Sequence, residues 1–200
     1  MAAHLTQLLG PGPLEETRPL KLRAFFGLPV PETCREPLSR YLDACASIAP
    51  EFRWVAAANL HLTVRFIGAV ERELVDGIAT SLGSARLRGF DLELGDFGTF
   101  KRGRLVRVAW LGLRSGAEHA AALAAAVEAE CVRAGLEPEA RPFQPHLTLA
   151  RARARDGGVL PVLPEAPQVE PWRARELVLY RSRLGSAGAV YEPLRVLSLD

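Results

Sequence analysis

Two stretches of the chain alternate apolar and polar residues with the period of a half-buried strand. The apolar positions of the first stretch are Leu60, Leu62, Val64 and Phe66, and the polar positions between them are His61, Thr63 and Arg65. In the second stretch Leu147 and Leu149 alternate with His146 and Thr148. Successive side chains of a strand point to opposite faces, so each stretch predicts a strand that presents a histidine and a threonine on one polar face.

The remaining patterns predict an alternation of strands and helices along the chain. Apolar runs bounded by Gly or Pro predict further strands at 22–28, 90–94, 105–111 and 177–182, the last strand of the chain. Helical spacing of apolar residues predicts helices at 38–48 and 71–82, and an alanine-rich helix up to Gly135 that begins at a capping box of Ser115 and Glu118. Glycines predict a turn at 95–98, and the Pro- and Gly-rich segment 156–171 is expected to lack regular structure.

The order strand, helix, histidine strand occurs twice. Phe25, in the middle of the first leading strand, precedes His61 by 36 residues, and Val108 precedes His146 by 38. This repetition predicts two similar units, roughly 21–100 and 101–200, packed about an approximate two-fold axis. Residues 1–20 are expected to form a flexible N-terminal extension, because Gly and Pro interrupt them and they lack apolar periodicity.

A pair of histidines brought together by such a repeat has the chemistry of a general acid and a general base. The unperturbed pKa of a histidine is about 6.5, so that both protonation states are available near neutral pH. The neighbouring threonine hydroxyls are suited to hydrogen bonding an anion held between the imidazoles. A third His-Leu-Thr, at His4–Thr6, lacks the alternating flank, and His119 lies in the alanine-rich helix. Neither is expected to take part.

Composition limits the alternatives without choosing among them. The 200 residues are 48% hydrophobic and 24% charged, as in an ordinary globular domain, and the net charge of +2 does not by itself indicate a nucleic-acid partner. Nearly all the basic residues are arginines, which suit bidentate phosphate contacts, although a genomic codon bias gives the same enrichment.

Cysteine usage and hydropathy favour a reduced, cytoplasmic protein. Three cysteines without a C-x-x-C pair do not form a disulfide framework. The first ten residues lack the parts of a signal peptide, and no stretch is long and apolar enough to span a membrane. No metal site is expected, since neither histidine strand carries a second ligand at a suitable spacing. Trp54, Trp110 and Trp172 are core or rim residues, or stack on a base if exposed.

Five segments of the chain resemble the 2H phosphoesterases, and within them the bacterial and archaeal RNA 2′,3′-cyclic phosphodiesterases, also called LigT-like or 2′-5′ RNA ligase proteins. The segments are 23–29, 59–68, 141–151, 177–184 and 191–194. The likeness extends from about Leu22 to the C-terminus. It implies a bilobal α+β fold that forms one domain over 21–200. In this fold two antiparallel sheets face a central cleft, with helices outside and one HxTx motif in each lobe.

The resemblance also implies a reaction and roles for individual residues. RNA with a 2′,3′-cyclic phosphate terminus, such as the halves of a cleaved tRNA, is hydrolysed to a 2′-phosphomonoester by a monomer that uses no cofactor. By position, His61 is the proton donor and His146 the proton acceptor, while Thr63 and Thr148 bind the phosphate. Arg65 continues the His61 face and is an expected phosphate contact. Arg151 is a further candidate, but it has the wrong parity unless its strand bends.

Two other functions stay open at this level. One is a sister 2H enzyme that acts on small cyclic nucleotides or on 2′-5′ linked oligonucleotides, and the other is a non-catalytic protein that binds RNA ends. The implied chemistry also allows ATP-independent 2′-5′ ligation as the reverse reaction, consistent with the absence of a G-x-x-x-x-G-K-[ST] phosphate loop.

Overall fold

The computed structural model describes residues 21–185 and 188–200 of the chain. The predicted extension 1–20, with the third His-Leu-Thr, lies outside the described residues. The strands are β1 (Lys21–Pro29), β2 (Phe52–Trp54), β3 (His61–Glu71), β4 (Phe90–Arg102), β5 (Leu105–Ser115), β6 (Leu147–Ala152), β7 (Trp172–Ala174), β8 (Glu176–Gly185) and β9 (Gly188–Ser198). The helices are α1 (Glu32–Ile48), the short 3₁₀ helix η1 (Ala57–Asn59), α2 (Arg72–Ser84) and α3 (Ala117–Arg133).

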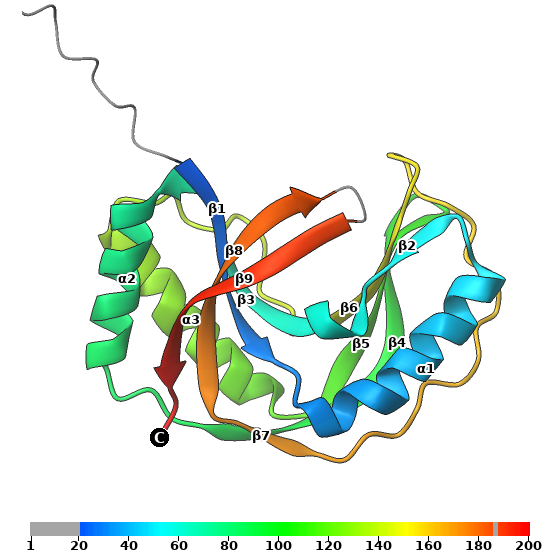
Figure 1. Ribbon diagram of the computed structural model, residues 1–200, viewed down its shortest axis with the longest axis horizontal. Coiled ribbons are helices and arrows are strands. Elements are labelled where there is room, and N and C mark those ends of the chain that lie inside the picture. The colour runs from blue at the N-terminus through cyan, green and yellow to red at the C-terminus, as the bar shows by residue number, and fades with distance from the viewer. Residues whose placement is uncertain (1–20, 186–187) are drawn as a thin grey trace, which may run out of the picture.

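All strand pairs are antiparallel and belong to one strongly bent sheet (Figure 1). The strand order is β7-β4-β5-β6-β3-β1-β8-β9, and β2 pairs with the far end of β6. The predicted α+β class is confirmed. The two expected sheets are, however, the two arms of one sheet, because β3 and β6 pair at Leu62 and Leu147 where the arms meet.

Each half of the sequence places a long strand near its end in the arm formed mainly by the other half. β4, at the end of the first half, pairs with β5, while β8 from the second half pairs with β1. One arm therefore holds β1, β3, β8 and β9, and the other holds β2, β4, β5, β6 and β7. The strand order is symmetric about the β3–β6 junction, but the arms do not coincide with residues 21–100 and 101–200.

The helices cover the outer faces of the two arms (Figure 1). α2 and α3 pack on the β3 arm and against each other, and α1 lies along the other arm. Apolar positions on one side of each helix enter the core, such as Leu38 and Leu42 in α1 and Val127 in α3. This burial supplies most of the stabilisation of the helices, since isolated helices of this length are marginal in water. It leaves the inner faces of the two arms for polar residues.

Three differences from the sequence predictions have clear physical causes. β4 continues through the predicted turn at 95–98, because Gly98 makes room for the Trp110 ring: a Cβ atom there would lie 2.2 Å from the indole. The capping box at Ser115 does not form, since β5 extends to Ser115 and Gly116, at a φ of 84°, is the N-cap of α3. β9 follows β8 as a further strand, whose alternation is broken by Pro193.

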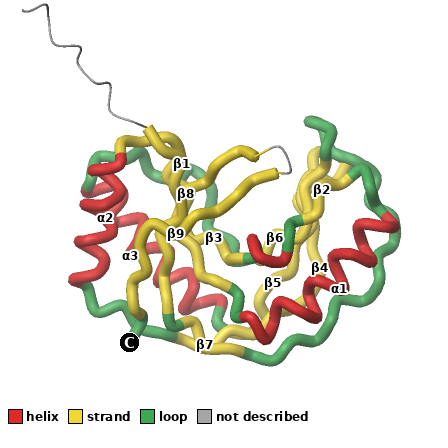
Figure 2. The backbone as a smooth tube through the Cα atoms, viewed as in Figure 1, coloured by secondary structure: helices red, strands yellow, loops and turns green. Residues whose placement is uncertain are grey.

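The segment between β6 and β7 has little regular structure, as expected. Figure 2 shows it as a long loop that returns along the outside of the arm that contains β4. Among the helices of the described residues, none is both long enough and apolar enough to cross a membrane.

Candidate active site

The two histidine motifs meet at the junction of the two arms. Leu62 pairs with Leu147 in antiparallel register. Extending this register by one residue on either side places His61 opposite Thr148 and Thr63 opposite His146. Partners directly opposite each other share a face of the sheet. We call this surface, defined by His61, Thr63, His146 and Thr148, the histidine face. The leucines point to the other side and are buried at 2% and 0% exposure.

His61 is held by two hydrogen bonds and by aromatic rings. Its Nδ1 lies 2.7 Å from the carbonyl oxygen of Asn59, and its Nε2 lies 3.0 Å from the Oγ1 of Thr63. A carbonyl only accepts, so Nδ1 carries the proton and Nε2 of the neutral ring accepts from the threonine hydroxyl. The rings of Phe25 and Tyr191 lie with centroids 4.7 and 5.0 Å from the imidazole. The Nε2 atom is thereby directed onto the histidine face.

His146 has the same backbone support in the other arm. Its Nδ1 lies 2.7 Å from the carbonyl oxygen of Gln144, also two residues upstream. The ring of Phe100 meets it edge-on at 5.0 Å, and Trp110 lies at 6.0 Å. Both histidines therefore have Nδ1 bound to a backbone carbonyl, which leaves Nε2 as the atom able to exchange a proton, although Nε2 of His61 also accepts from Thr63. This is the arrangement that an acid and base pair requires.

Burial lowers the pKa of both histidines. Desolvation is the main cause and lowers the pKa of His61 to about 4, with further lowering by the charge of Arg151 and by His146, while the bond to Asn59 opposes it. The pKa of His146 is also lowered, again chiefly by desolvation, and Arg151 contributes. Both imidazoles are thus neutral at pH 7 when no anion is bound.

A bulge in β6 brings Arg151 onto the histidine face. Trp110 pairs with Thr148 but its neighbour Ala109 pairs with Ala150, so that Leu149 is an extra residue in β6. Leu149 and Ala150 are consecutive buried residues, and the parity of the strand is reversed beyond them. From the sequence, Arg151 could share the face of His146 only if its strand bends, and this bulge provides the bend. Its charge acts on both histidines, as their pKa values show.

A corresponding bulge in β3 removes Arg65 from the histidine face. Gly27 pairs with Thr63 and Phe26 with Arg65, so that Val64 is the extra residue and the expected shared face of Arg65 and His61 is wrong. The Arg65 side chain, 11% exposed, forms an ion pair with Glu128 of α3 and lies 3.5 Å from a Glu139 oxygen. It also donates to the Glu137 carbonyl at 2.7 Å. Arg65 thus ties β3 to α3 and to the segment that leads to His146.

Sequence analysis missed several side chains around this site. Tyr180 and Tyr191 flank His61 from β8 and β9, and no local pattern indicated that this hairpin would return to β1. Arg53 pairs with Arg151 across β2 and β6, but β2 is only three residues long and was not predicted. Trp110, taken as a core or rim residue, lies half-buried beside His146.

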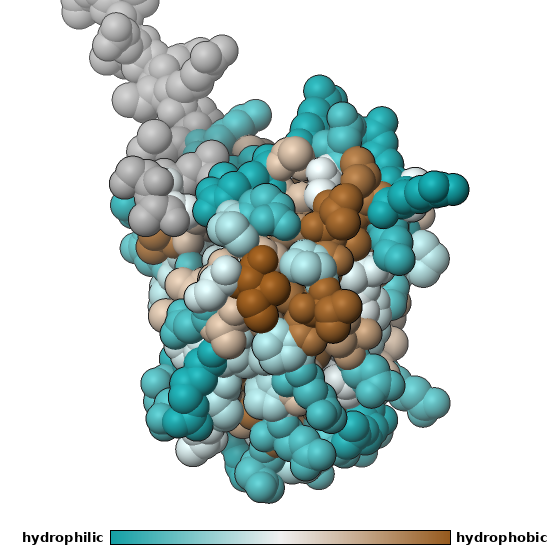
Figure 3. Space-filling model, turned by 90° about the vertical axis from the view of Figure 1, so that its right-hand side faces the viewer, coloured by the Kyte–Doolittle hydropathy of each residue, from teal (hydrophilic) through white to brown (hydrophobic). Residues whose placement is uncertain are grey.

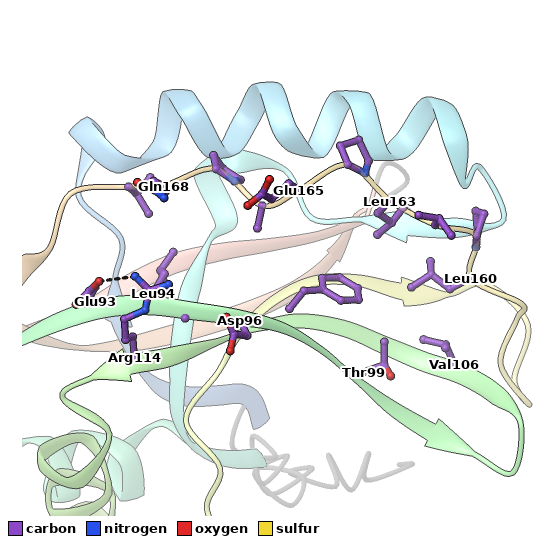
Figure 4. Close-up of a pocket in the computed structure, with 18 of the residues that line it drawn as sticks. Glu93, Leu94, Asp96, Thr99, Val106, Arg114, Leu160, Leu163, Glu165 and Gln168 are labelled. Atoms are coloured by element: carbon purple, nitrogen blue, oxygen red, sulfur yellow. Dashed lines mark hydrogen bonds and ion pairs between the residues drawn. The ribbon is translucent and has the colours of Figure 1, made fainter.

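A cavity of about 810 Å³ lies elsewhere, between the edge of β4 and the segment 160–171 (Figure 4). Glu93, Asp96, Glu165 and Arg114 are among its lining residues, and Arg114 is paired with Glu93 at 2.9 Å. None of the histidine-face residues lines it. Figure 3, which shows the side of the molecule that lies on the right in Figure 1, has a patch of apolar surface. The exposed side chain of Val162 belongs to the segment that borders the cavity.

The described residues contain no group of three or more His, Cys, Asp or Glu side chains placed to hold a metal ion. The polar atoms on the histidine face include two imidazole nitrogens, two hydroxyls and the guanidinium of Arg151. This set can bind an anion and transfer protons on either side of it.

Comparison with known proteins identifies the same combination of fold and sequence. The model of the 2′-5′ RNA ligase superfamily matches residues 34–185. The RNA 2′,3′-cyclic phosphodiesterase of Escherichia coli is 33% identical over 174 residues, which cover 86% of this chain and 94% of that protein. The phosphodiesterase of the same name from Methanothermobacter thermautotrophicus is 32% identical over 188 residues, 90% of this chain and all of that protein.

Solved structures agree with these matches. The crystal structure of Escherichia coli LigT in its apo form superposes with a TM-score of 0.75 at 31% identity, covering 90% of this chain and 98% of that chain. LigT has also been crystallised with 3′-AMP, and that complex gives the same TM-score of 0.75.

Proposed function

Since the chain belongs to the 2′-5′ RNA ligase superfamily, we propose that it is an RNA 2′,3′-cyclic phosphodiesterase that opens a terminal cyclic phosphate to a 2′-phosphomonoester. The observation that carries the proposal is the matched support of His61 and His146. Each Nδ1 is bound to a backbone carbonyl two residues upstream, and both rings belong to one face of the sheet. The names of the relatives supply the substrate class.

The reaction follows from the positions of these two rings. Water attacks the phosphorus while Nε2 of His146 takes its proton, and the bond from phosphorus to the 3′ oxygen breaks. The departing 3′ oxygen receives a proton from Nε2 of His61, which leaves a 3′ hydroxyl and a 2′-phosphate. Each transfer is a general acid or base step at a positioned nitrogen.

Charge on the phosphate is balanced by donors on the same face. The hydroxyls of Thr63 and Thr148 and the guanidinium of Arg151 are proposed to bind its non-bridging oxygens, which stabilises the charge that develops during attack. Arg65 is left out of this set, because it points away from the histidine face and is already paired with Glu128. We propose no metal or nucleotide cofactor for the step.

The bound phosphate also increases the fraction of His61 that carries a proton to donate. In the free protein the pKa of His61 is held at about 4, mainly by burial. A negative phosphate beside the ring favours its protonated form and raises the pKa toward the working range. The protonated ring keeps its Nδ1 bond to Asn59 and directs the second proton at the leaving oxygen.

The same site is also proposed to join a 2′,3′-cyclic end to an RNA 5′ hydroxyl, and to cleave the resulting 2′-5′ linkage in the reverse direction. An alcohol then replaces water as the group that His146 deprotonates, and the product is a 2′-5′ phosphodiester. No ATP is consumed, because the new ester bond to the 5′ oxygen forms as the ester bond to the 3′ oxygen breaks.

The test is the identity of the product. An oligoribonucleotide with a 2′,3′-cyclic phosphate end is incubated with the protein in EDTA, and its end group is compared by chromatography with 2′- and 3′-phosphate standards. The matched control carries a 3′-phosphate and should be unchanged. We expect the 2′-phosphate alone. No product, a 3′-phosphate, or inhibition by EDTA contradicts the proposed reaction.

A further inference from the structure

Two arginines stand directly opposite each other on the histidine face. Arg53 of β2 pairs with Arg151 of β6, and these partners share a face of the sheet. The adjacent positions of both strands, Phe52 and Ala150, are buried on the opposite side in a small apolar cluster. Arg53 is exposed and lies farther along β6 than the threonine of the second motif. The pair therefore extends the site away from the histidines toward the end of β6.

A third arginine joins them from the next strand. Val108 of β5 pairs with Arg151 and with Phe100, while Lys101 pairs with Val106, which leaves Arg107 as the extra residue of a bulge. Arg107 is the chain neighbour of Val108, the partner of Arg151, and its charge lowers the pKa of Arg151. Three adjacent strands thus each contribute one guanidinium to the same region.

Arg53, Arg107 and Arg151 form no ion pair in the described part of the chain, a property that they share with other arginines such as Arg86 and Arg181. Eleven ion pairs occur among residues 21–185 and 188–200, and all of them use other basic side chains. Like charges directly opposite each other in a sheet are destabilising. An arrangement that costs stability and keeps its donors free is typical of a site that binds an anion.

Arg151 links this cluster to the reaction centre. The bulge in β6 places Arg151 on the histidine face, three residues beyond Thr148, and its charge lowers the pKa of both histidines. A phosphate held between the histidines therefore lies on the same face as this guanidinium. β2 continues the same side of β6 that β3 occupies at the junction (Figure 1). A chain that leaves the terminal phosphate along this arm meets Arg53 next.

We propose that Arg53, together with Arg107 and Arg151, forms a second anion subsite that binds the phosphodiester on the 5′ side of the terminal nucleotide. This inference rests on the proposed function, and it names the substrate as an oligonucleotide in preference to a cyclic mononucleotide. Guanidinium groups contact the non-bridging oxygens of the backbone, so the subsite holds any base sequence. A 2′,3′-cyclic mononucleotide reaches the histidines but leaves Arg53 empty.

The test compares two substrates and two variants. We measure kcat/KM for 2′,3′-cyclic AMP and for a short oligoadenylate with the same cyclic end, using the wild type, Arg53→Gln and the control Arg86→Gln. Arg86 is an exposed arginine beyond the end of α2, and its substitution removes the same charge. Arg53→Gln should lower kcat/KM for the oligonucleotide about tenfold or more, as one charged hydrogen-bonded contact predicts, and leave the mononucleotide within twofold. Arg86→Gln should change neither.

A second substrate tests the same contact. It carries a neutral methylphosphonate in place of the phosphodiester on the 5′ side of the terminal nucleotide, and its cyclic phosphate end is unchanged. The methylphosphonate should lower kcat/KM of the wild type as much as the Arg53→Gln substitution lowers kcat/KM for the natural substrate. In Arg53→Gln the methylphosphonate should leave kcat/KM unchanged. Equal losses for both substrates in Arg53→Gln, or no loss in either, overturn the subsite.

Binding separates this proposal from the proposed function. A fluorescent oligonucleotide with a 2′-phosphate end is titrated with each variant at several salt concentrations. Arg53→Gln should bind more weakly than Arg86→Gln and show a smaller dependence on salt. If the wild type hydrolyses neither substrate, the proposed function fails while this difference in binding still supports the subsite. Equal binding by the two variants rejects it.

Discussion

The Nε2 atom of His61 lies 3.0 Å from the Oγ1 atom of Thr63, two residues along the same strand. The other ring nitrogen is bound to the Asn59 carbonyl, so the threonine hydroxyl donates to the neutral ring. When His61 gains a proton, the same hydroxyl must turn to accept or to contact the phosphate. Proton transfer and phosphate binding are therefore coupled at this pair.

The pH dependence of the reaction follows from the lowered pKa values. The profile of kcat/KM reports the free enzyme, in which the pKa of His61 is about 4 and that of His146 lies below 6.5. Both limbs of that bell-shaped profile should lie below pH 6.5. Bound phosphate raises the pKa of His61, so the profile of kcat should be displaced to higher pH. Initial rates between pH 3.5 and 9, at low and saturating substrate, measure both. Coincident profiles centred above pH 7 contradict this account.

Asn59 links His61 to the β8–β9 hairpin. Its side-chain amide donates to the Ala189 carbonyl at 2.8 Å, while its own carbonyl accepts from His61. Asn59→Ala should lower stability by about 1 kcal/mol, the usual net value of one hydrogen bond, and lower kcat more than it changes KM. Gln144→Ala is the matched control, because Gln144 supports His146 through its carbonyl only. Urea unfolding and steady-state kinetics distinguish them, and equal effects of the two substitutions argue against this role.

Two arginines should respond in opposite ways to substitution. Arg65→Met removes the partner of a mostly buried Glu128 carboxylate and should cost roughly 2–3 kcal/mol in the free energy of unfolding. Arg151→Met should leave stability unchanged or raise it, and lower kcat/KM by about 10²-fold through loss of a phosphate donor. Both variants are compared by urea unfolding and by hydrolysis of the cyclic end. The reverse pattern contradicts the faces given to these residues.

The positions of the main strands and helices and of the two motifs were predictable from local pattern. Alternation identified the strands of His61 and His146, and helical spacing identified α1, α2 and α3. The two β-bulges were not predictable, because they depend on how β1 and β5 pair with these strands. Each bulge reverses parity, which is why Arg65 was placed on the wrong face and Arg151 required a bend. The pairing of β8 with β1 is also non-local, and it brings Tyr180 and Tyr191 to His61.

Repulsion between Arg53 and Arg151 should lower the stability of the folded protein slightly. Arg53 faces Arg151 directly, and like charges across a strand pair are unfavourable by roughly 0.2–1 kcal/mol. Arg53→Gln should therefore raise the free energy of unfolding by up to about 1 kcal/mol at low salt, and the gain should shrink as salt screens the charges. Arg86→Gln should not produce this gain. Thermal unfolding at two ionic strengths measures it, and a loss of stability in Arg53→Gln means that the arginines do not repel each other.

The central claim is that His61 and His146 act together on one transition state. The most direct measurement is a double-mutant cycle on hydrolysis of an oligoribonucleotide with a 2′,3′-cyclic phosphate end, with the exposed His119→Ala as control. Each of His61→Ala and His146→Ala should lower kcat/KM by roughly 10²- to 10⁴-fold, the usual contribution of one positioned acid or base. The double variant should lose much less than the product of the two, since the groups work as a unit. Losses below tenfold for either histidine, strict additivity, or a comparable loss in His119→Ala would contradict the claim.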